Sequence, residues 1–216
     1  MSINLYTSSY TTSNPQRNLE LEFCYNQNKA NSHINNIFLI ASQTKITFSK
    51  LFEKVNETSG EDDINIIANS DIYFNNSIAH SLNMHKDHVY ALSRWNNNKR
   101  GLVRAKAVGS ADAWIFRGKK SIYSDFYTGY WGCDGRLGYE IIKAGNKLYN
   151  PSLTIKAIHL HQSNIRGDKK CPFQGRTEVV VGPYAGALAS TIEKLVPGKI
   201  ITSPLPKHYI LPKGNK

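Results

Sequence analysis

Three apolar segments, separated by stretches with helical spacing, do most to limit how this chain of 216 residues can fold. The apolar segments are residues 2–8 (SINLYTS), 35–42 (NNIFLIAS) and 64–71 (INIIANSD). Residues 16–29 and 50–58 lie between them and repeat apolar side chains every three or four positions, as amphipathic helices do. Strands that alternate with helices in this way predict an α/β fold with a mostly parallel central sheet flanked by helices.

The later part of the chain continues the alternation. Its pattern of apolar residues predicts helices over 76–85 and 134–146, and strands over 88–95, 111–118 and 152–162. The first helix is expected to bury Leu19 and Phe23, and the last to bury Leu137, Ile141 and Ile142 before ending at Gly145. The pattern weakens after Lys169. We therefore expect one domain over 1–216, with a core of about 2–168 and a C-terminal extension over 169–216.

Charge and cysteine content narrow the classes of partner. Lys and Arg number 27 against 16 Asp and Glu, a net charge of +11, which favours an anionic partner. The basic residues are scattered, so specific binding along a nucleic acid is not expected.

Three cysteines without a CxxC pair do not predict a disulfide framework. With no apolar segment of membrane-spanning length and no signal peptide, we expect a soluble cytoplasmic protein without a transmembrane segment.

Polar side chains gather where the predicted strands end. They follow the first strand (Thr7, Ser8, Tyr10), the third (Asn69, Ser70, Asp71) and the fourth (Arg94), with Asp112 and Asp134 further along the chain. In an open parallel sheet, ligands bind at the carboxyl ends of the strands. The sequence therefore predicts one cleft lined by these side chains.

Four segments, in this order and spacing, resemble small nucleotide-sugar glycosyltransferases of the GT-A fold: NSDIYFN, YALSRW, SADAWIFRG and GCDGRLGYEIIKAGNKLYNPSLTIKAIHLHQSNIR. The likeness extends to the glycosyltransferase domain with which chlorella viruses decorate their capsid protein, and it covers residues 2–168. It implies a single GT-A domain that moves a hexose from a nucleoside-diphosphate sugar, most simply a UDP-sugar, to a hydroxyl of a glycan or glycoprotein. For a viral protein the resemblance implies action in the host cytoplasm.

The same resemblance implies a metal-binding segment after a central strand. Here that segment is Asn69-Ser70-Asp71, with one acid where the family usually has two. Asp71 would hold Mn²⁺ or Mg²⁺ between the protein and the donor phosphates, and a simple strand-end turn is the alternative. His159 and His161 lie two positions apart on a predicted strand and so face the same side. We expect at least one of them to be a metal ligand, and a structural histidine is the alternative for each.

The resemblance also implies a nucleotide cradle after the first strand. Thr7, Ser8 and Tyr10 would hold the uracil or ribose, and Arg17 the base or a phosphate. An ordinary helix-capping loop with a solvated arginine is the alternative. Arg166, in the segment NIRGDKK, would close on the diphosphate unless that segment is a solvated loop.

Arg94, Asp112 and Asp134 complete the predicted site. Arg94 and Asp112 would hydrogen-bond the donor sugar, and we include Asp112 with Asp134 as a catalytic candidate. Asp134 would be the general base if the reaction inverts the anomeric centre, a choice that the sequence leaves open. As the alternative, Asp134 caps the helix that follows it.

Three other functions compete with glycosyl transfer. A nucleotidyltransferase of similar fold would need a Gly-rich basic segment after the first strand, which YTSSYTTSNPQR lacks. A nucleic-acid-binding protein without enzymatic activity is suggested by charge alone. A catalytically silent sugar-binding protein would bind a nucleotide sugar without turning it over.

Overall fold

The computed structural model describes residues 1–43, 45–98, 101–104, 111–130, 132–163, 191–196 and 199–204. The strands are β1 (Ile3–Ser9), β2 (Asn36–Ala41), β3 (Ile64–Ala68), β4 (Ile72–Phe74), β5 (His88–Leu92), β6 (Trp95–Asn98), β7 (Gly101–Arg104), β8 (Ala113–Arg117), β9 (Lys147–Tyr149), β10 (Ala157–His159), β11 (Thr191–Val196) and β12 (Lys199–Pro204). The helices are α1 (Pro15–Ala30), α2 (Phe48–Thr58), α3 (Cys133–Lys143) and the 3₁₀ helix η1 (Asn76–Asn83). The expected α/β class is confirmed.

The central sheet has the strand order β2-β1-β3-β8-β5-β9. β1 pairs in parallel with β2 and β3, and β5 pairs in parallel with β9. β8 runs antiparallel to both of its neighbours, so the expected mostly parallel sheet is in fact mixed. Parallel neighbours need a crossover, usually a helix, whereas the described residues between β5 and β8 form the β6–β7 hairpin and no helix. β8 therefore returns antiparallel beside β5.

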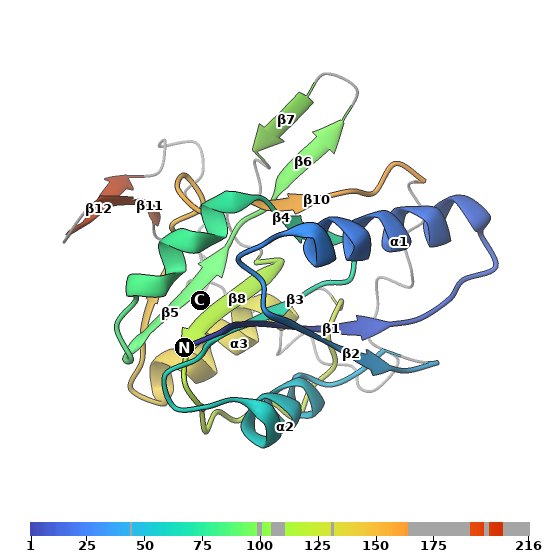
Figure 1. Ribbon diagram of the computed structural model, residues 1–216. Helices are drawn as coiled ribbons and strands as arrows, with labels where there is room; N and C mark the ends of the chain where they lie inside the picture. Colours follow the sequence, from blue (N-terminus) through green and yellow to red (C-terminus); the bar gives the residue numbers. More distant parts are fainter. Residues whose placement is uncertain are drawn as a thin grey trace, which may run out of the picture.

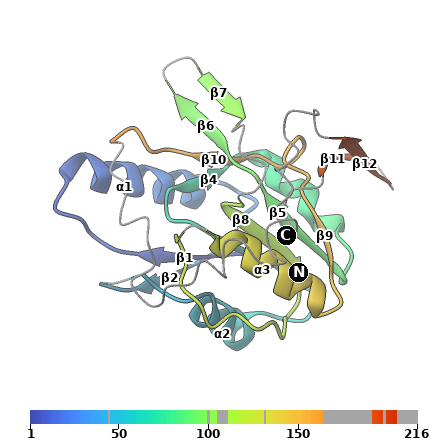
Figure 2. The same ribbon diagram turned by 180° about the vertical axis from the view of Figure 1, so that it is seen from behind.

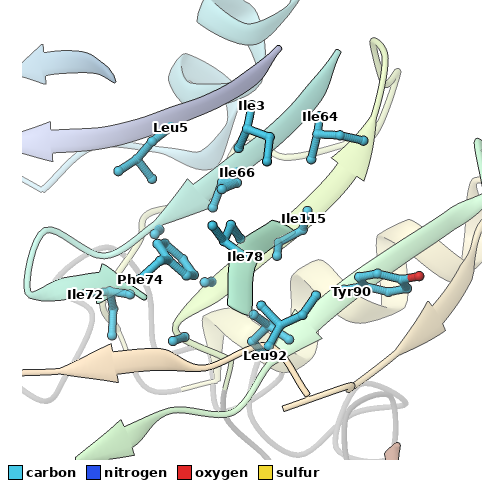
Figure 3. Close-up of a cluster of buried hydrophobic side chains, with 14 of the residues drawn as sticks. Ile3, Leu5, Ile64, Ile66, Ile72, Phe74, Ile78, Tyr90, Leu92 and Ile115 are labelled. Carbon is cyan, nitrogen blue, oxygen red and sulfur yellow. The ribbon is translucent and has the colours of Figure 1, made fainter. Parts of the chain in front are cut away.

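Two apolar clusters cover the two faces of the central sheet, because side chains on a strand alternate between faces. One cluster joins the central strands to η1 and β4, as Figure 3 shows with Ile3, Leu5, Ile64, Ile66, Ile115, Ile78 and Phe74. The other joins the central strands to α2 and α3 through Tyr6, Ile67, Trp114, Phe116, Phe52, Val55, Leu137 and Ile141. Figures 1 and 2 show α2 and α3 on one side of this sheet and α1 with β4 and β10 on the other.

The face of α1 that packs against the protein is polar, contrary to the expectation. Leu19 and Phe23 are 59% and 42% exposed, and the buried positions are Arg17, Glu20, Cys24 and Asn28. These positions recur at helical spacing and turn toward β4 and the segment after β10, where backbone groups need partners. The side chain of Asn28, for example, donates to the carbonyl of Ile72 and accepts from the amide of Phe74. Helix α1 thus carries hydrogen-bonding groups where an apolar stripe was predicted.

Several smaller expectations need correction. β2 lies at the edge of the sheet and is only partly buried, and the strand predicted over 88–95 is divided between β5 and β6. Ile142 is 49% exposed, because the buried stripe of α3 runs through Leu137 and Ile141. Only 157–159 of the strand predicted over 152–162 forms, as β10.

The described parts of the C-terminal extension are β11 and β12, which pair as an antiparallel hairpin. The remainder of that extension, and Arg166, lie outside the described residues. Within the described ranges, no helix combines the length and the apolar character needed to cross a membrane.

Candidate metal and ligand site

The carboxyl ends of β1 and β3 lie side by side, because the two strands are parallel neighbours. β2 lies on the other side of β1, so the chain changes direction across the sheet between β1 and β3, where ligands of α/β proteins bind. The polar side chains predicted after the first and third strands meet at this edge. The hydroxyl oxygens of Ser8, near the end of β1, and Ser70, after β3, are 3.2 Å apart.

Asp71, His159 and His161 form a group that could hold a metal ion, with one ligand atom from each residue and all three atoms within 4.8 Å of one another. Asp71 Oδ2 lies 3.1 Å from His159 Nε2 and 3.8 Å from His161 Nδ1. The antiparallel pairing of β10 with β4 sets His159 opposite Ile72, next to Asp71. The strand register therefore brings His159 to Asp71, and His161 follows two residues after the end of β10.

The neighbours of His159 fix which of its nitrogens carries hydrogen. Asn96 Oδ1 accepts a hydrogen bond from Arg94 Nε at 3.2 Å, so this atom is an acceptor, and it also faces His159 Nδ1 at 3.3 Å. Nδ1 must therefore donate. His159 Nε2 then either donates a hydrogen bond to Asp71 Oδ2 or offers its lone pair to a metal. An oxygen that accepts from the other ring nitrogen, as Asn96 Oδ1 does here, is what orients metal-bound imidazoles in proteins.

Arg17 is buried beside this group, so the alternative of a solvated arginine is wrong. Helix α1 begins at Pro15, and the N-cap side chain of Asn14 accepts from the amide of Arg17 at 2.9 Å. The guanidinium then reaches Asp71, with Nη2 2.7 Å from Asp71 Oδ2. Nη1 donates to Glu20 Oε2 at 3.1 Å, one helical turn further along α1.

Glu20 holds the chain segment that follows His161. Its carboxylate accepts from the amides of Gln162 and Ser163 at 2.8 and 2.6 Å, and from the Ser163 hydroxyl at 2.9 Å. Burial raises the pKa of Glu20, but the bonds from Ser163 and Arg17 outweigh it and leave that pKa below its ordinary value. Glu20 is thus an anion that anchors the His161 segment to α1.

The electrostatics of the group suit metal ligation. Burial raises the pKa of Asp71, but the hydrogen bond and charge of His159, with the charge of Arg17, outweigh it and leave that pKa well below the ordinary range. Burial and the nearby Arg17 charge lower the pKa of His161. A carboxylate that stays ionised and an imidazole that stays neutral are the protonation states in which both side chains bind metals.

A second group of carboxylates lies at the same edge of the sheet. Asp112 is buried, and its Oδ1 accepts from Arg94 Nη1 at 3.2 Å and from Asn69 Nδ2 at 3.1 Å. Asp134 Oδ2 accepts from the amide of Ala111 at 3.4 Å. Desolvation, with the neighbouring charge of Asp112, raises the pKa of Asp134 to about 7. Desolvation also raises the pKa of Asp112.

Asp134 does not cap α3, so the alternative of a capping role is wrong. The N-cap residue is Gly132, whose φ of 89° lies in the left-handed region, and Asp134 is the second residue of the helix. A left-handed turn favours glycine because it has no Cβ. The backbone therefore enters the helix at Gly132, and the Asp134 carboxylate turns to Ala111 and Cys133.

Arg94 and Asn96 connect the two groups. Arg94 contacts Asp112 and Asn96, and Asn96 contacts His159, so hydrogen bonds run from Asp112 to His159. Sequence reasoning missed Asn96 and Glu20. The signals for them were their spacings, two positions after Arg94 and three positions after Arg17.

Unpartnered polar atoms mark where a ligand can add hydrogen bonds. Five buried side-chain atoms lack a partner within the described part of the chain, and three belong to predicted site residues: Thr7 Oγ1, Asp112 Oδ2 and His161 Nε2. Buried polar groups are nearly always satisfied, so such atoms call for an unseen partner. Tyr10, by contrast, is 38% exposed, with its hydroxyl 3.4 Å from Arg17 Nη2.

Comparison with known proteins adds no assignment, since no protein-family model and no curated protein matches this chain. What the site can do is therefore decided by its own chemistry. Three features lie at one edge of the sheet: the side chains of Asp71, His159 and His161, which could hold a metal ion, the buried Arg17, and Asp134 with its raised pKa.

Proposed function

We propose that the chain is a metal-dependent glycosyltransferase of the GT-A type. It transfers a hexose from a nucleoside-diphosphate sugar, most simply a UDP-sugar, to a hydroxyl of a glycan or glycoprotein. The observation that carries the proposal is the Asp71-His159-His161 group after β3, linked through Asn96 and Arg94 to Asp112. The transfer needs a positive charge that stabilises the departing diphosphate and a base that takes the proton of the acceptor. A metal held by Asp71, His159 and His161 would supply the charge, and the carboxylates at the same edge of the sheet would supply the base.

Asp71, His159 and His161 would hold the metal. The ionised Asp71 fits that role, and so does His161, whose Nδ1 lies 3.8 Å from Asp71 Oδ2. A divalent cation bound there supplies positive charge for the departing nucleoside diphosphate. Two imidazoles and one carboxylate suit Mn²⁺ better than Mg²⁺, which prefers oxygen ligands and retains its water.

The residues around the metal group would hold the donor. Thr7 and Ser8, at the end of β1, would contact the nucleoside, with Tyr10 beside it. The unpartnered Asp112 Oδ2 would accept a hydrogen bond from a sugar hydroxyl, while Arg94, bound to Asp112 Oδ1, would donate one. A pocket that pairs buried polar atoms with substrate hydroxyls discriminates strongly between substrates.

Asp134 would act on the acceptor. Its raised pKa, about 7, matches the requirement for a general base at neutral pH. In an inverting reaction the acceptor hydroxyl would give its proton to the Asp134 carboxylate while the acceptor oxygen bonds to the anomeric carbon, and the bond from that carbon to the diphosphate oxygen would break to release the nucleoside diphosphate. In a retaining reaction Asp134 would instead orient the acceptor.

The test is a panel of nucleoside-diphosphate sugars, assayed for Mn²⁺-dependent release of nucleoside diphosphate by the wild-type protein and by Asp134→Asn. We expect at least one donor to be consumed by the wild type only. A nucleotidyltransferase would instead release pyrophosphate from a nucleoside triphosphate. Failure of every donor, with the protein folded and Mn²⁺ bound, would contradict glycosyl transfer.

A further inference from the structure

The oxygen that would bind the metal is already occupied by a cation. Asp71 Oδ2 lies 2.7 Å from Arg17 Nη2, closer than either histidine nitrogen. Arg17 and Asp71 are both buried, so their charges are poorly screened by water. A metal ion on Asp71 Oδ2 and a guanidinium on the same atom would repel each other strongly. The two cations therefore compete for one site.

Arg17 has other partners that it can keep when it leaves Asp71. Its Nη1 donates to Glu20 Oε2 at 3.1 Å and to the carbonyl of Leu160 at 3.4 Å, and its Nη2 reaches the Tyr10 hydroxyl at 3.4 Å. Loss of the Asp71 contact thus leaves the guanidinium paired with the anion of Glu20.

Without a metal, Arg17 has a clear structural role. An ionised carboxylate buried without a countercharge is strongly destabilising. Arg17 supplies that countercharge to Asp71, while α1, which packs along β4, keeps it in place (Figure 1). The site is thereby held together before any ligand arrives.

We propose that Arg17 is a resident counter-cation: it pairs with Asp71 in the metal-free protein, yields Asp71 Oδ2 to a divalent metal, and turns its guanidinium to the diphosphate of the donor. The proposal rests on the function proposed above and adds a regulation to that site. A metal that bridges a carboxylate and a diphosphate brings phosphate oxygens next to Arg17. Guanidinium groups bind phosphate through two parallel hydrogen bonds. A metal that binds alone must therefore displace Arg17 from Asp71 Oδ2. A metal that binds together with a diphosphate gains the hydrogen bonds between Arg17 and the phosphate oxygens.

Two titrations of opposite sign test the exchange. Arg17→Met should bind Mn²⁺ alone about tenfold tighter than wild type, as measured by the free Mn²⁺ signal in electron paramagnetic resonance, because one charge-assisted hydrogen bond no longer competes. At saturating Mn²⁺, the same variant should bind UDP about tenfold weaker by calorimetry, because it lacks a phosphate ligand. The matched control is Arg117→Met, since Arg117 pairs with Asp62 at the opposite end of the sheet. It should change neither affinity.

A folded Arg17→Met protein whose Mn²⁺ affinity is unchanged or weaker would overturn the competition. Unchanged affinity for UDP would overturn the diphosphate role. If Arg17→Met does not fold, the wild-type protein decides by nuclear magnetic resonance with diamagnetic Zn²⁺. The guanidinium signals that disappear in Arg17→Lys should shift on Zn²⁺ addition and again on UDP addition, and unmoved signals would overturn the proposal. Since no assay needs turnover, opposite shifts alongside a failed donor panel would reject glycosyl transfer and retain the exchange.

Discussion

Asp134→Asn should stabilise the protein at alkaline pH while removing its activity. Desolvation and the charge of Asp112 raise the pKa of Asp134 from an ordinary 3.8 to about 7, so the folded protein retains a proton that the unfolded chain has lost. Between these two pKa values the folded state binds more protons, and wild-type stability falls as pH rises through this window. The full difference corresponds to about 4 kcal/mol above pH 7, and to almost nothing below pH 4.

An asparagine at this position does not ionise and so avoids the loss. Its side-chain oxygen and nitrogen are close in shape to the carboxylate, and the oxygen can accept from either the amide of Ala111 or the thiol of Cys133. Urea unfolding of both proteins at pH 4, 6 and 8 should show a stability gain for Asp134→Asn that grows with pH. Asp125→Asn, which changes an exposed acid in the loop before α3, is the control and should track the wild type.

The transfer assay supplies the other half of the prediction. An amide cannot take a proton at neutral pH, so Asp134→Asn should lose about 10²-fold to 10⁴-fold in rate, the range for a general base. Unfolding curves that stay parallel from pH 4 to pH 8 would show that Asp134 is not desolvated as argued. A variant that is more stable and fully active would leave the desolvation standing and refute the catalytic role.

Two further outcomes follow from the site and one from the charge of the chain. Asp71→Asn should lose measurable Mn²⁺ binding and at least about 10²-fold in turnover, as when one preorganised electrostatic group is lost, and an active metal-dependent variant would contradict the metal assignment. Glu20→Gln should weaken Mn²⁺ affinity about tenfold, the scale of second-shell changes, because it loosens the segment after His161; an unchanged Mn²⁺ titration would show that this anchor is not needed. Because the positive charge is dispersed, binding to duplex DNA at physiological salt should be no tighter than about 10⁻⁶ M in a polarisation assay, and tight sequence-selective binding would favour a nucleic-acid function.

The parts of the fold that the sequence predicts well are those set by local pattern. β3 and β8 contain near-continuous apolar residues because both of their faces are covered, and α2 shows a plain apolar stripe. The direction of β8 is a different kind of property. It depends on how the chain returns from β5, and the side-chain pattern of a buried strand is the same in either direction.

Helix α1 shows why the site was only partly predictable. Its apolar residues Leu19 and Phe23 have helical spacing, so hydrophobic periodicity selects the wrong face. The buried face is polar because it satisfies β4 and the segment after β10, and that need arises only once those strands are in place. Asp71 could be predicted from its place at a strand end, whereas its pairing with Arg17 depends on tertiary contacts.

The most direct test of the account is a crystal structure with Mn²⁺ and UDP, with data collected at the manganese absorption edge. We predict an anomalous peak bounded by Asp71, His159 and His161, with a phosphate oxygen of UDP as a further ligand and the Arg17 guanidinium on the diphosphate. A structure in which UDP is bound but the peak lies elsewhere, or is missing while Arg17 remains on Asp71, would contradict a metal-bridged nucleotide site.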